Sequence, residues 1–486
     1  MSALDIEIVP HAGSAILERP GVESIAPARR ESYSRHLNLL SNRFVIYRPQ
    51  FLPTVQKLFS SPLVIIAAAV VARVGYMIHF FHGQPATGNH YFPLYEVVSV
   101  AKSVAEGHGF SSPLYLPSGP TAMVTPIYTY ILAGVFKLFG TLSLQSSIAI
   151  RLLDVLLSAL TCAPIMAIGR RVFSAGTAAL AGWIWAALPS SIFYAVVWIW
   201  DTSLSTLVLT LALWTTYVVA ERNDAKAWCG LGFVWGIGTL VNSAMLPVFP
   251  GCLAFAVYGA RQRGVSWFRT AAATLLVFSV TLSPWILRNE RVFRGKVFLR
   301  SNFGLELWLG NNPEVPISCS CWLHPASDAK ERARYLQLGE VDYVQEKQRQ
   351  ALQFMQTHPS DTLRHIYHRF METWTGFGDS FADIWASRML FLRATLVLNY
   401  SLTILAFTGL LLAYRTLRAN ALPLLNLMAV FPVVYYLCHM DPRYRQPIEP
   451  VIAMLAAFAV VRGLSVLRSR LTFSQQISTA GVKSQP

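Results

Sequence analysis

Charged residues are scarce in this sequence. Only 13% of its 486 residues are Asp, Glu, Lys or Arg, while 54% are hydrophobic. Soluble globular proteins usually carry about a quarter of charged residues, so the composition excludes an ordinary soluble domain and indicates a multi-pass membrane protein. The net charge of +15 is spread between apolar blocks rather than gathered on one basic stripe with aromatic residues. We therefore expect no nucleic-acid partner.

Cysteines are also few, with six in the whole chain. Cys319 and Cys321 are the one closely spaced pair, and a bridge between residues two apart is strained, so we expect no disulfide framework. No Cys or His pattern has the spacing of a zinc site.

The apolar runs predict an all-α bundle. A helix needs about 20 mainly apolar residues to cross a membrane. About ten segments are predicted to do so: residues 62–81, 146–168, 175–195, 202–220, 227–245, 246–260, 269–286, 390–413, 420–437 and 449–467. The short loops on one side carry nine basic residues, while those on the other carry Arg443 and Arg445 alone. This asymmetry puts both termini in the cytoplasm.

These spans divide the chain into five predicted parts. They are a mobile cytoplasmic tail (1–60), an N-terminal transmembrane module (61–286) that includes an external loop (82–143), a long external loop with helices between the seventh and eighth spans (287–389), C-terminal transmembrane helices (390–467) and a cytoplasmic tail (468–486).

Three further predictions concern the external loops and the first span. Residues 126–139 are too short to cross, and crossing would place Arg170 and Arg171 outside, so we expect an interfacial helix in the external loop. Within the long loop we expect helices over 328–357 and 359–372. Arg73 lies inside the first span, where it either faces other helices or a watery cavity, or extends to the interface.

A carboxylate follows the first span, in the stretch GNHYFPLYEVVSVAKSVAEGHGF at residues 88–110. Apolar residues recur there at helical spacing, and Gly107 and Gly109 end the run. Ser99, Lys102, Ser103 and Glu106 form the polar face. Such a helix is expected to lie along the membrane surface with Glu96 facing water. A surface glutamate without a function is the alternative interpretation.

Further polar residues fall on the same predicted face. WIWDTSL puts Asp201 at the external end of the fourth span, where it can complement the helix dipole or work with Glu96 as a base, an acceptor ligand or a metal ligand. Arg288 follows SPWIL, and HMDPRYRQPIEP carries Arg443 and Arg445. Arginine binds phosphate with two parallel hydrogen bonds, although anchoring at the interface is an alternative role.

These pieces occur in a recognisable order. The sequence has YEVVSVAKSVAEGHGF, then TPIYTYILAGVFKLFG, GRRVF, WIWDTSL, SPWILRN, NFGLELWLGNN and RYRQPIEP. The combination, over roughly residues 60–465, resembles the GT-C membrane glycosyltransferases. It is most similar to the branch that contains the dolichyl-phosphate-mannose-protein mannosyltransferases (family 39) and the aminoarabinose transferases.

The resemblance implies an inverting hexosyl- or pentosyltransferase with a polyprenyl-phosphate sugar donor and a glycan, lipid or protein acceptor. The family's first external acid, a base or metal-associated group, falls on Glu96, which Tyr95 precedes in place of a second acid. Its second external acid falls on Asp201. Arg443, Tyr444 and Arg445 would meet the donor phosphate, with Arg288 as a further partner. The sequence leaves open whether Glu96 and Asp201 hold a divalent metal.

The same resemblance implies a bacterial plasma (inner) membrane enzyme of the cell envelope, with its active site on the external or periplasmic face. Two other functions stay open. A transporter is compatible with ten spans and Arg73, although we find no inverted repeat or matched pair of broken helices. A non-catalytic lipid-binding member of the same fold is also compatible, because fold does not fix function.

Overall fold

The computed structural model describes residues 57–83, 92, 95–222, 224–264, 266–376 and 390–482, without the side chains of 390–392 and 471–482. The described residues all belong to one compact unit, Gln56–Pro486. They form helices joined by loops, with an isolated β-bridge between Ser111 and Pro120. The predicted all-α class is confirmed. The predicted tail 1–60 lies outside the described residues except for its last four.

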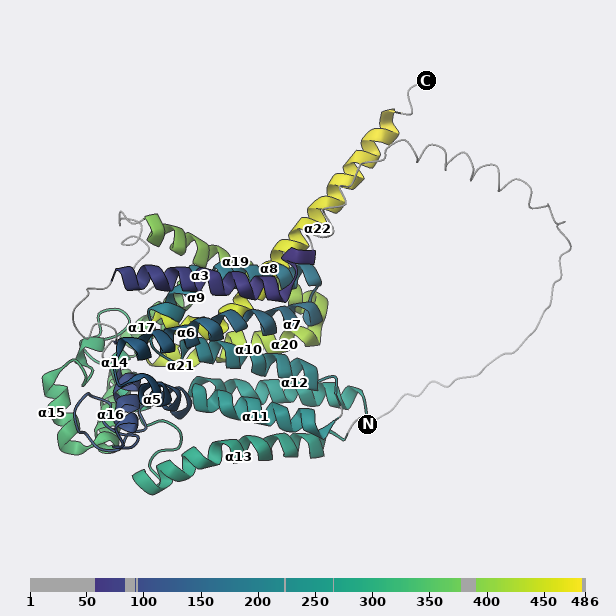
Figure 1. The fold of residues 1–486 in the computed structure, drawn as a ribbon. Coiled ribbons are helices and arrows are strands. Elements are labelled where there is room, and N and C mark those ends of the chain that lie inside the picture. Colours follow the sequence, from purple (N-terminus) through teal and green to yellow (C-terminus); the bar gives the residue numbers. More distant parts are fainter. Residues whose placement is uncertain are drawn as a thin grey trace, which may run out of the picture. The chain divides into compact units, whose positions relative to one another are not determined.

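A bundle of apolar helices makes up most of the unit (Figure 1). Its members are α3 (Pro62–His82), α6 (Leu144–Leu160), α7 (Cys162–Val172), α8 (Ala175–Ala187), α9 (Pro189–Val196), α10 (Thr202–Val219), α11 (Ala225–Val241), α12 (Phe249–Gln262), α13 (Trp267–Phe293), α19 (Leu390–Leu417), α20 (Leu422–Val430), α21 (Val433–Leu437) and α22 (Glu449–Val482).

Fewer of these helices meet the length and apolarity of a span than the sequence predicts. In the described part seven segments do, or eight if the bent pair α8 and α9 forms one span. The segment Arg393–Leu437 counts as one, where two spans are predicted, and α11 is one of the shorter apolar helices. The number of ten therefore stays a prediction. At the C-terminus, α22 continues as a helix to Val482, beyond the predicted start of the tail at residue 468.

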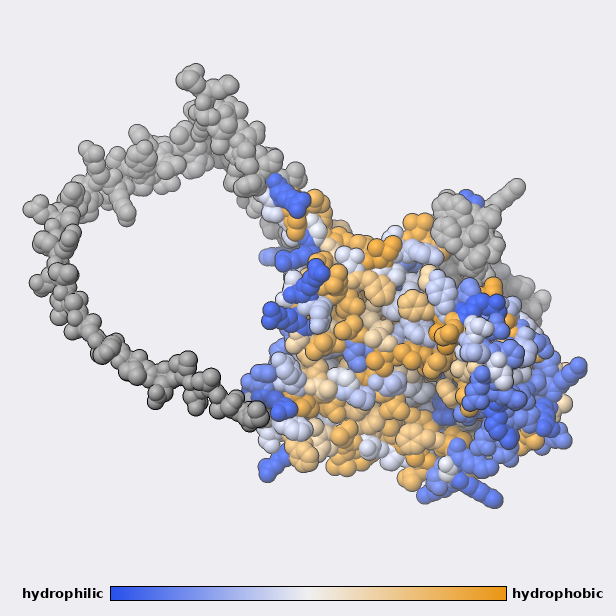
Figure 2. All heavy atoms as spheres, turned by 180° about the vertical axis from the view of Figure 1, so that it is seen from behind, coloured by the Kyte–Doolittle hydropathy of each residue, from blue (hydrophilic) through white to orange (hydrophobic). Residues whose placement is uncertain are grey.

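The surface of the bundle is suited to a bilayer. Figure 2 shows a broad hydrophobic band between two hydrophilic ends. Large apolar side chains project from it, with Leu63, Phe268 and Leu276 exposed by 78%, 69% and 65%. Such a surface is unfavourable in water but matches hydrocarbon, where helices satisfy their own backbone hydrogen bonds. The chain is an integral membrane protein.

The basic loops that the sequence places together meet at one end of the bundle. Arg171 pairs with Glu221 after α10, and Arg263 after α12 donates a hydrogen bond to the carbonyl oxygen of Arg222. The opposite end carries the short helices α4 (Glu96–Ala105) and α5 (Pro126–Phe139). The helices of the long loop lie at the same end, beside α5 (Figure 1).

Arg73 is fully buried where α8 bends into α9 at an angle of 49°. Pro189 has no amide hydrogen, so the carbonyl of Trp185, four residues earlier, lacks its usual helical donor. The guanidinium of Arg73 donates to the carbonyl oxygens of Trp185 and Ala186 at 3.2 and 3.1 Å, and to Ser191 Oγ at 2.8 Å. Of the alternatives open from the sequence, the structure shows an arginine facing other helices.

The long loop folds into a cap of α14 (Phe303–Gly310), α15 (Ala329–Leu338), α16 (Glu340–Thr357) and α17 (Pro359–Thr375). The single helix expected over 328–357 is wrong, because Gly339 adopts a φ of 76° and separates α15 from α16. The helix expected from residue 359 is confirmed. Cys319 and Cys321 form a disulfide, contrary to our expectation. Residues 377–389 of the loop lie outside the described residues.

The helix that begins at Glu96 packs differently from the prediction. In α4 (Glu96–Ala105), Val98, Val100 and Ala101 are fully buried against α5 (Pro126–Phe139) and its neighbours. Ser99 and Ser103 are buried as well, since their hydroxyls donate to the carbonyl oxygens of Ser112 and Gly109. The other two residues of this polar face, Lys102 and Glu106, stay partly exposed and form an ion pair, so half of the face is buried and half meets the surface. That α5 lies on the membrane without crossing it stays a prediction.

Candidate active site

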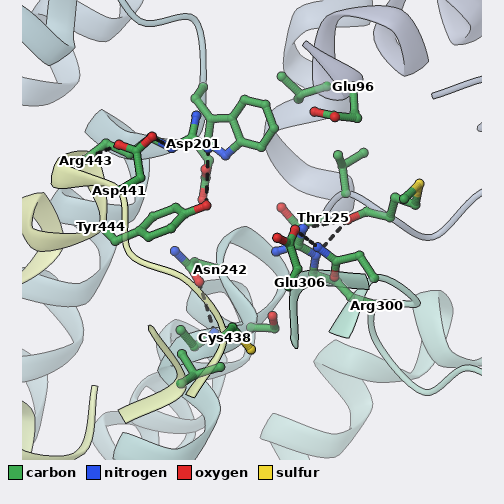
Figure 3. A pocket seen from close by; sticks show the side chains of 18 of the residues that line it. Glu96, Thr125, Asp201, Asn242, Arg300, Glu306, Cys438, Asp441, Arg443 and Tyr444 are labelled. Carbon is green, nitrogen blue, oxygen red and sulfur yellow. Dashed lines mark hydrogen bonds and ion pairs between the residues drawn. The ribbon is translucent and has the colours of Figure 1, made fainter. Parts of the chain in front are cut away.

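A cavity of about 660 Å³ lies at the capped end of the bundle. Four of the predicted site residues line it, namely Glu96, Asp201, Arg443 and Tyr444 (Figure 3). They come from α4, the start of α10 and the turn η5 (Pro442–Ile448). The fold thus brings together side chains separated by more than 300 residues in the sequence.

Glu96 is the first residue of α4 and faces a histidine of the cap. Its Oε1 lies 3.4 Å from Nε2 of His324. The other ring nitrogen of His324, Nδ1, accepts a hydrogen bond from the Ala326 amide at 3.1 Å. In the neutral ring the proton is therefore on Nε2, pointing at the Glu96 carboxylate. The long loop thereby closes over this acid.

Asp201 immediately precedes α10 and is almost completely buried. Its Oδ2 accepts a hydrogen bond of 2.6 Å from Ser205. Burial raises the pKa of Asp201, and the Ser205 hydrogen bond and the charges of Arg300 and Arg443 offset part of the rise. A carboxylate with a raised pKa is a stronger proton acceptor than a solvated one.

Arg443 lies among aromatic rings. Its guanidinium carbon is 5.1 Å from the ring centre of Trp198, 4.6 Å from Trp200 and 5.1 Å from Tyr444. Nη2 donates a hydrogen bond of 3.3 Å to the Tyr444 hydroxyl, whereas the buried Nε makes none. A carboxylate oxygen of Asp441 lies 3.8 Å from that Nε. The rings fix the plane of the guanidinium at the wall of the cavity.

Arg300 also lines the cavity and was not singled out in the sequence. Its Nε and Nη2 donate to the carbonyl oxygen of Met123 at 2.9 and 2.6 Å. Its charge acts on both Asp201 and Glu306. The available signal was its position two residues before Asn302, where NFGLELWLGNN begins.

The other two predicted phosphate ligands do not line the cavity. Arg288 donates to the carbonyl oxygens of Thr121 and Phe110 at 2.8 and 2.9 Å and thereby fastens the preceding loop. Arg445 is buried and forms an ion pair with Glu449. The structure therefore brings Glu96, Asp201, Arg443 and Tyr444 together, and it does not bring Arg288 or Arg445 to them.

Glu306 of α14 contributes a further carboxylate that sequence reasoning missed. Its Oε2 lies 3.1 Å from Nδ1 of His439, and its Oε1 accepts a hydrogen bond of 2.6 Å from Asn302. Burial would raise the pKa of Glu306, but the hydrogen bond and charge of His439, with the charges of Arg300 and His324, lower it to about 2. Glu306 is therefore ionised at neutral pH.

The family model of the dolichyl-phosphate-mannose-protein mannosyltransferases matches residues 123–287. An archaeal oligosaccharyltransferase, AglB from Archaeoglobus fulgidus in complex with an inhibitory peptide and a dolichol-phosphate, has a TM-score of 0.51 and 16% identity over 86% of this chain and 52% of that chain. This chain has a GT-C fold. The predicted resemblance is confirmed at that level.

Two further structures resemble this GT-C chain. The Archaeoglobus fulgidus oligosaccharyltransferase in complex with Zn and sulfate has a TM-score of 0.50 and 16% identity, over 86% of this chain and 51% of that chain. ArnT from Cupriavidus metallidurans bound to undecaprenyl phosphate has a TM-score of 0.39 and 15% identity, over 83% and 78% of the two chains. Our GT-C chain spans about half the length of the archaeal enzyme. No curated protein sequence matches it.

Among the described residues, the side chains of the cavity do not form a cluster of metal ligands. Within the described ranges, no three His, Cys, Asp or Glu side chains converge as ligands for an ion. Glu96 faces His324, and Asp201 accepts its hydrogen bond from Ser205. Whether Glu96 and Asp201 hold a divalent cation together with groups of a bound donor stays an open prediction.

Proposed function

We propose that this chain is a membrane glycosyltransferase that moves a sugar from a polyprenyl-phosphate donor to an acceptor hydroxyl. One observation carries the proposal. A single cavity at one end of a membrane bundle is lined by two guanidiniums, Arg300 and Arg443, and by four carboxylates, among them Glu96 and Asp201. Support comes from the mannosyltransferase family match and from the dolichol-phosphate named with the archaeal relative.

Arg443 and Arg300 bind the donor phosphate. When the bond between C1 of the sugar and the phosphate oxygen breaks, the bonding electrons stay with the polyprenyl phosphate. Fixed positive charge stabilises this leaving group without protonating it. The aromatic rings around Arg443 strengthen the interaction, because they hold the guanidinium in place and exclude water.

Glu96 takes the proton of the acceptor hydroxyl while the acceptor oxygen forms its bond to C1. Asp201, buried at the start of α10, orients the acceptor. One displacement from the face opposite the phosphate inverts C1. The products are the glycosylated acceptor, polyprenyl phosphate and a proton on Glu96.

The classes of sugar and acceptor follow from the family resemblance of the sequence. The sugar is a hexose or a pentose, and the acceptor is a glycan, a lipid or a protein. Basic loops at the opposite end of the bundle support a cavity on the external or periplasmic face of a bacterial plasma membrane.

The test uses the purified chain in vesicles that contain labelled polyprenyl-phosphate hexoses and pentoses. We expect release of polyprenyl phosphate with transfer of the label. Glu96→Gln should reduce kcat by about a hundredfold or more and keep donor binding, because it removes the base and little volume. Uptake of a labelled solute without release of polyprenyl phosphate would instead indicate a transporter. Donor binding without turnover at any acceptor tried would indicate a lipid-binding protein.

A further inference from the structure

A continuous series of polar contacts crosses the cavity from α14 to η5. It runs from Glu306 through His439 and Tyr444 to Arg443, all of which line the cavity (Figure 3 labels three of the four). The contacts measure 3.1 Å from Glu306 to His439, 3.3 Å from His439 to Tyr444 and 3.3 Å from Tyr444 to Arg443. Glu306 and His439 have no part in the mechanism above.

The direction of these hydrogen bonds follows from the groups involved. A guanidinium can only donate, so Arg443 Nη2 donates to the Tyr444 oxygen. The Tyr444 hydroxyl hydrogen is then free to donate to Nε2 of His439. Nδ1 of His439 then carries the ring proton and lies 3.1 Å from Oε2 of the Glu306 carboxylate, as an ion-pair contact. Each group has one role, and the series is polarised from Arg443 to Glu306.

The chain segments that carry Glu306 and His439 pack directly against each other. α14, which carries Glu306, ends at Gly310, and a Cβ on Gly310 would overlap the carbonyl oxygen of Cys438, the residue before His439. Asn311 Nδ2 donates to the carbonyl oxygen of Leu437 at 2.8 Å. Tyr444 is fixed in addition by stacking on Tyr435, with ring centres 4.4 Å apart and an angle of 15° between the rings. This packing holds Glu306 close to His439.

We propose that Glu306 and His439 are positioning residues for the donor phosphate, which act by holding Tyr444 and, through it, the N–H groups of Arg443 toward the cavity. This inference rests on the proposed function, in which Arg443 binds that phosphate. The long loop then contributes to donor binding as well as to closing over Glu96. An ionised carboxylate at the far end of the series strengthens each bond by polarising the next.

The experiment is a double-mutant cycle on donor KM and kcat with the purified chain in vesicles. Glu306→Gln removes the charge at one end, and Tyr444→Phe removes the hydroxyl in the middle. Each should raise the donor KM by about tenfold, the loss of one charge-assisted hydrogen bond, with kcat changed much less. The double variant should be no worse than the more severe single variant, because the two changes break one series.

The control is Glu314→Gln, which removes an exposed acid of the same loop that does not line the cavity and should leave both constants unchanged. The inference is overturned if the increases in donor KM of the two single variants multiply in the double variant. It is also overturned if either single variant has the wild-type donor KM. Those results leave the proposed function intact if Arg443→Ala still raises the donor KM. The proposed function itself fails if the wild type releases no polyprenyl phosphate.

Discussion

Replacing Arg445 by alanine tests whether this arginine stabilises the fold or binds the donor. The side chain is 1% exposed, and its Nε lies 2.5 Å from an oxygen of Glu449, which is 2% exposed. Nη1 donates to the carbonyl oxygens of Thr373 and Trp374 at the end of α17. Arg445→Ala leaves the Glu449 carboxylate buried without its cation. Breaking one side of a buried pair costs about 3–5 kcal/mol, so the variant should unfold much more readily.

The measurement is unfolding of the purified protein in mild detergent, with donor KM determined on the folded fraction. Arg445→Ala should lower stability by that amount and leave donor KM within about twofold of the wild type. The double variant Arg445→Leu, Glu449→Leu should recover most of the loss, because an apolar pair of similar volume needs no compensating charge. Arg443→Ala is the matched comparison and should show the reverse pattern, with normal unfolding and a raised donor KM.

The reasoning would be refuted by an Arg445→Ala variant that unfolds like the wild type and binds donor weakly. Arg445 would then reach the phosphate, as the sequence resemblance implies, and the buried ion pair would have no structural weight.

Four further measurements test Glu306, Arg288, Gly310 and the topology. The pKa of Glu306 is lowered to about 2. The stabilisation by its carboxylate is therefore fully present above the ordinary glutamate pKa of about 4.3 and is lost as pH falls toward 2. The difference in unfolding free energy between the wild type and Glu306→Gln should stay constant between about pH 5 and about pH 7 and shrink in acid. Arg288→Ala should loosen the loop that it fastens and lower stability, with donor KM unchanged. Gly310→Ala should displace the Cys438 carbonyl and reduce turnover. In intact cells an impermeant thiol reagent should label a cysteine at position 314 and spare one at position 170, and labelling at 170 would contradict the topology.

Part of the site could be predicted because short motifs at the ends of spans are visible in the sequence. Glu96, Asp201, Arg443 and Tyr444 each adjoin an apolar run, so a topology alone assigns them to one end of the bundle. The pairing of Arg443 with Arg445 failed for a geometric reason. Residues two apart in a 3-10 turn such as η5 point to different sides, and one arginine enters the cavity while the other enters the helix packing.

Other side chains gave a weak or misleading local signal. Glu306 sits within LELWLG, which is typical of a buried apolar helix, and Arg300 is one of five basic residues in a short stretch. Ser99 and Ser103 look like a solvated helix face, but neighbouring carbonyl groups cover them. Each of these outcomes depends on which segment of the chain packs opposite, and sequence spacing does not contain that information.

The helical, membrane-embedded character of this protein follows from its sequence. Hydrocarbon offers no hydrogen bonds, so any long apolar run must satisfy its backbone internally as a helix, and that constraint is local. Which polar groups meet depends on how the helices pack. Glu96, Asp201, Arg300, Glu306 and Arg443 share a cavity because helices far apart in the chain pack together, and the free energy of those contacts depends on distances that no stretch of sequence fixes alone.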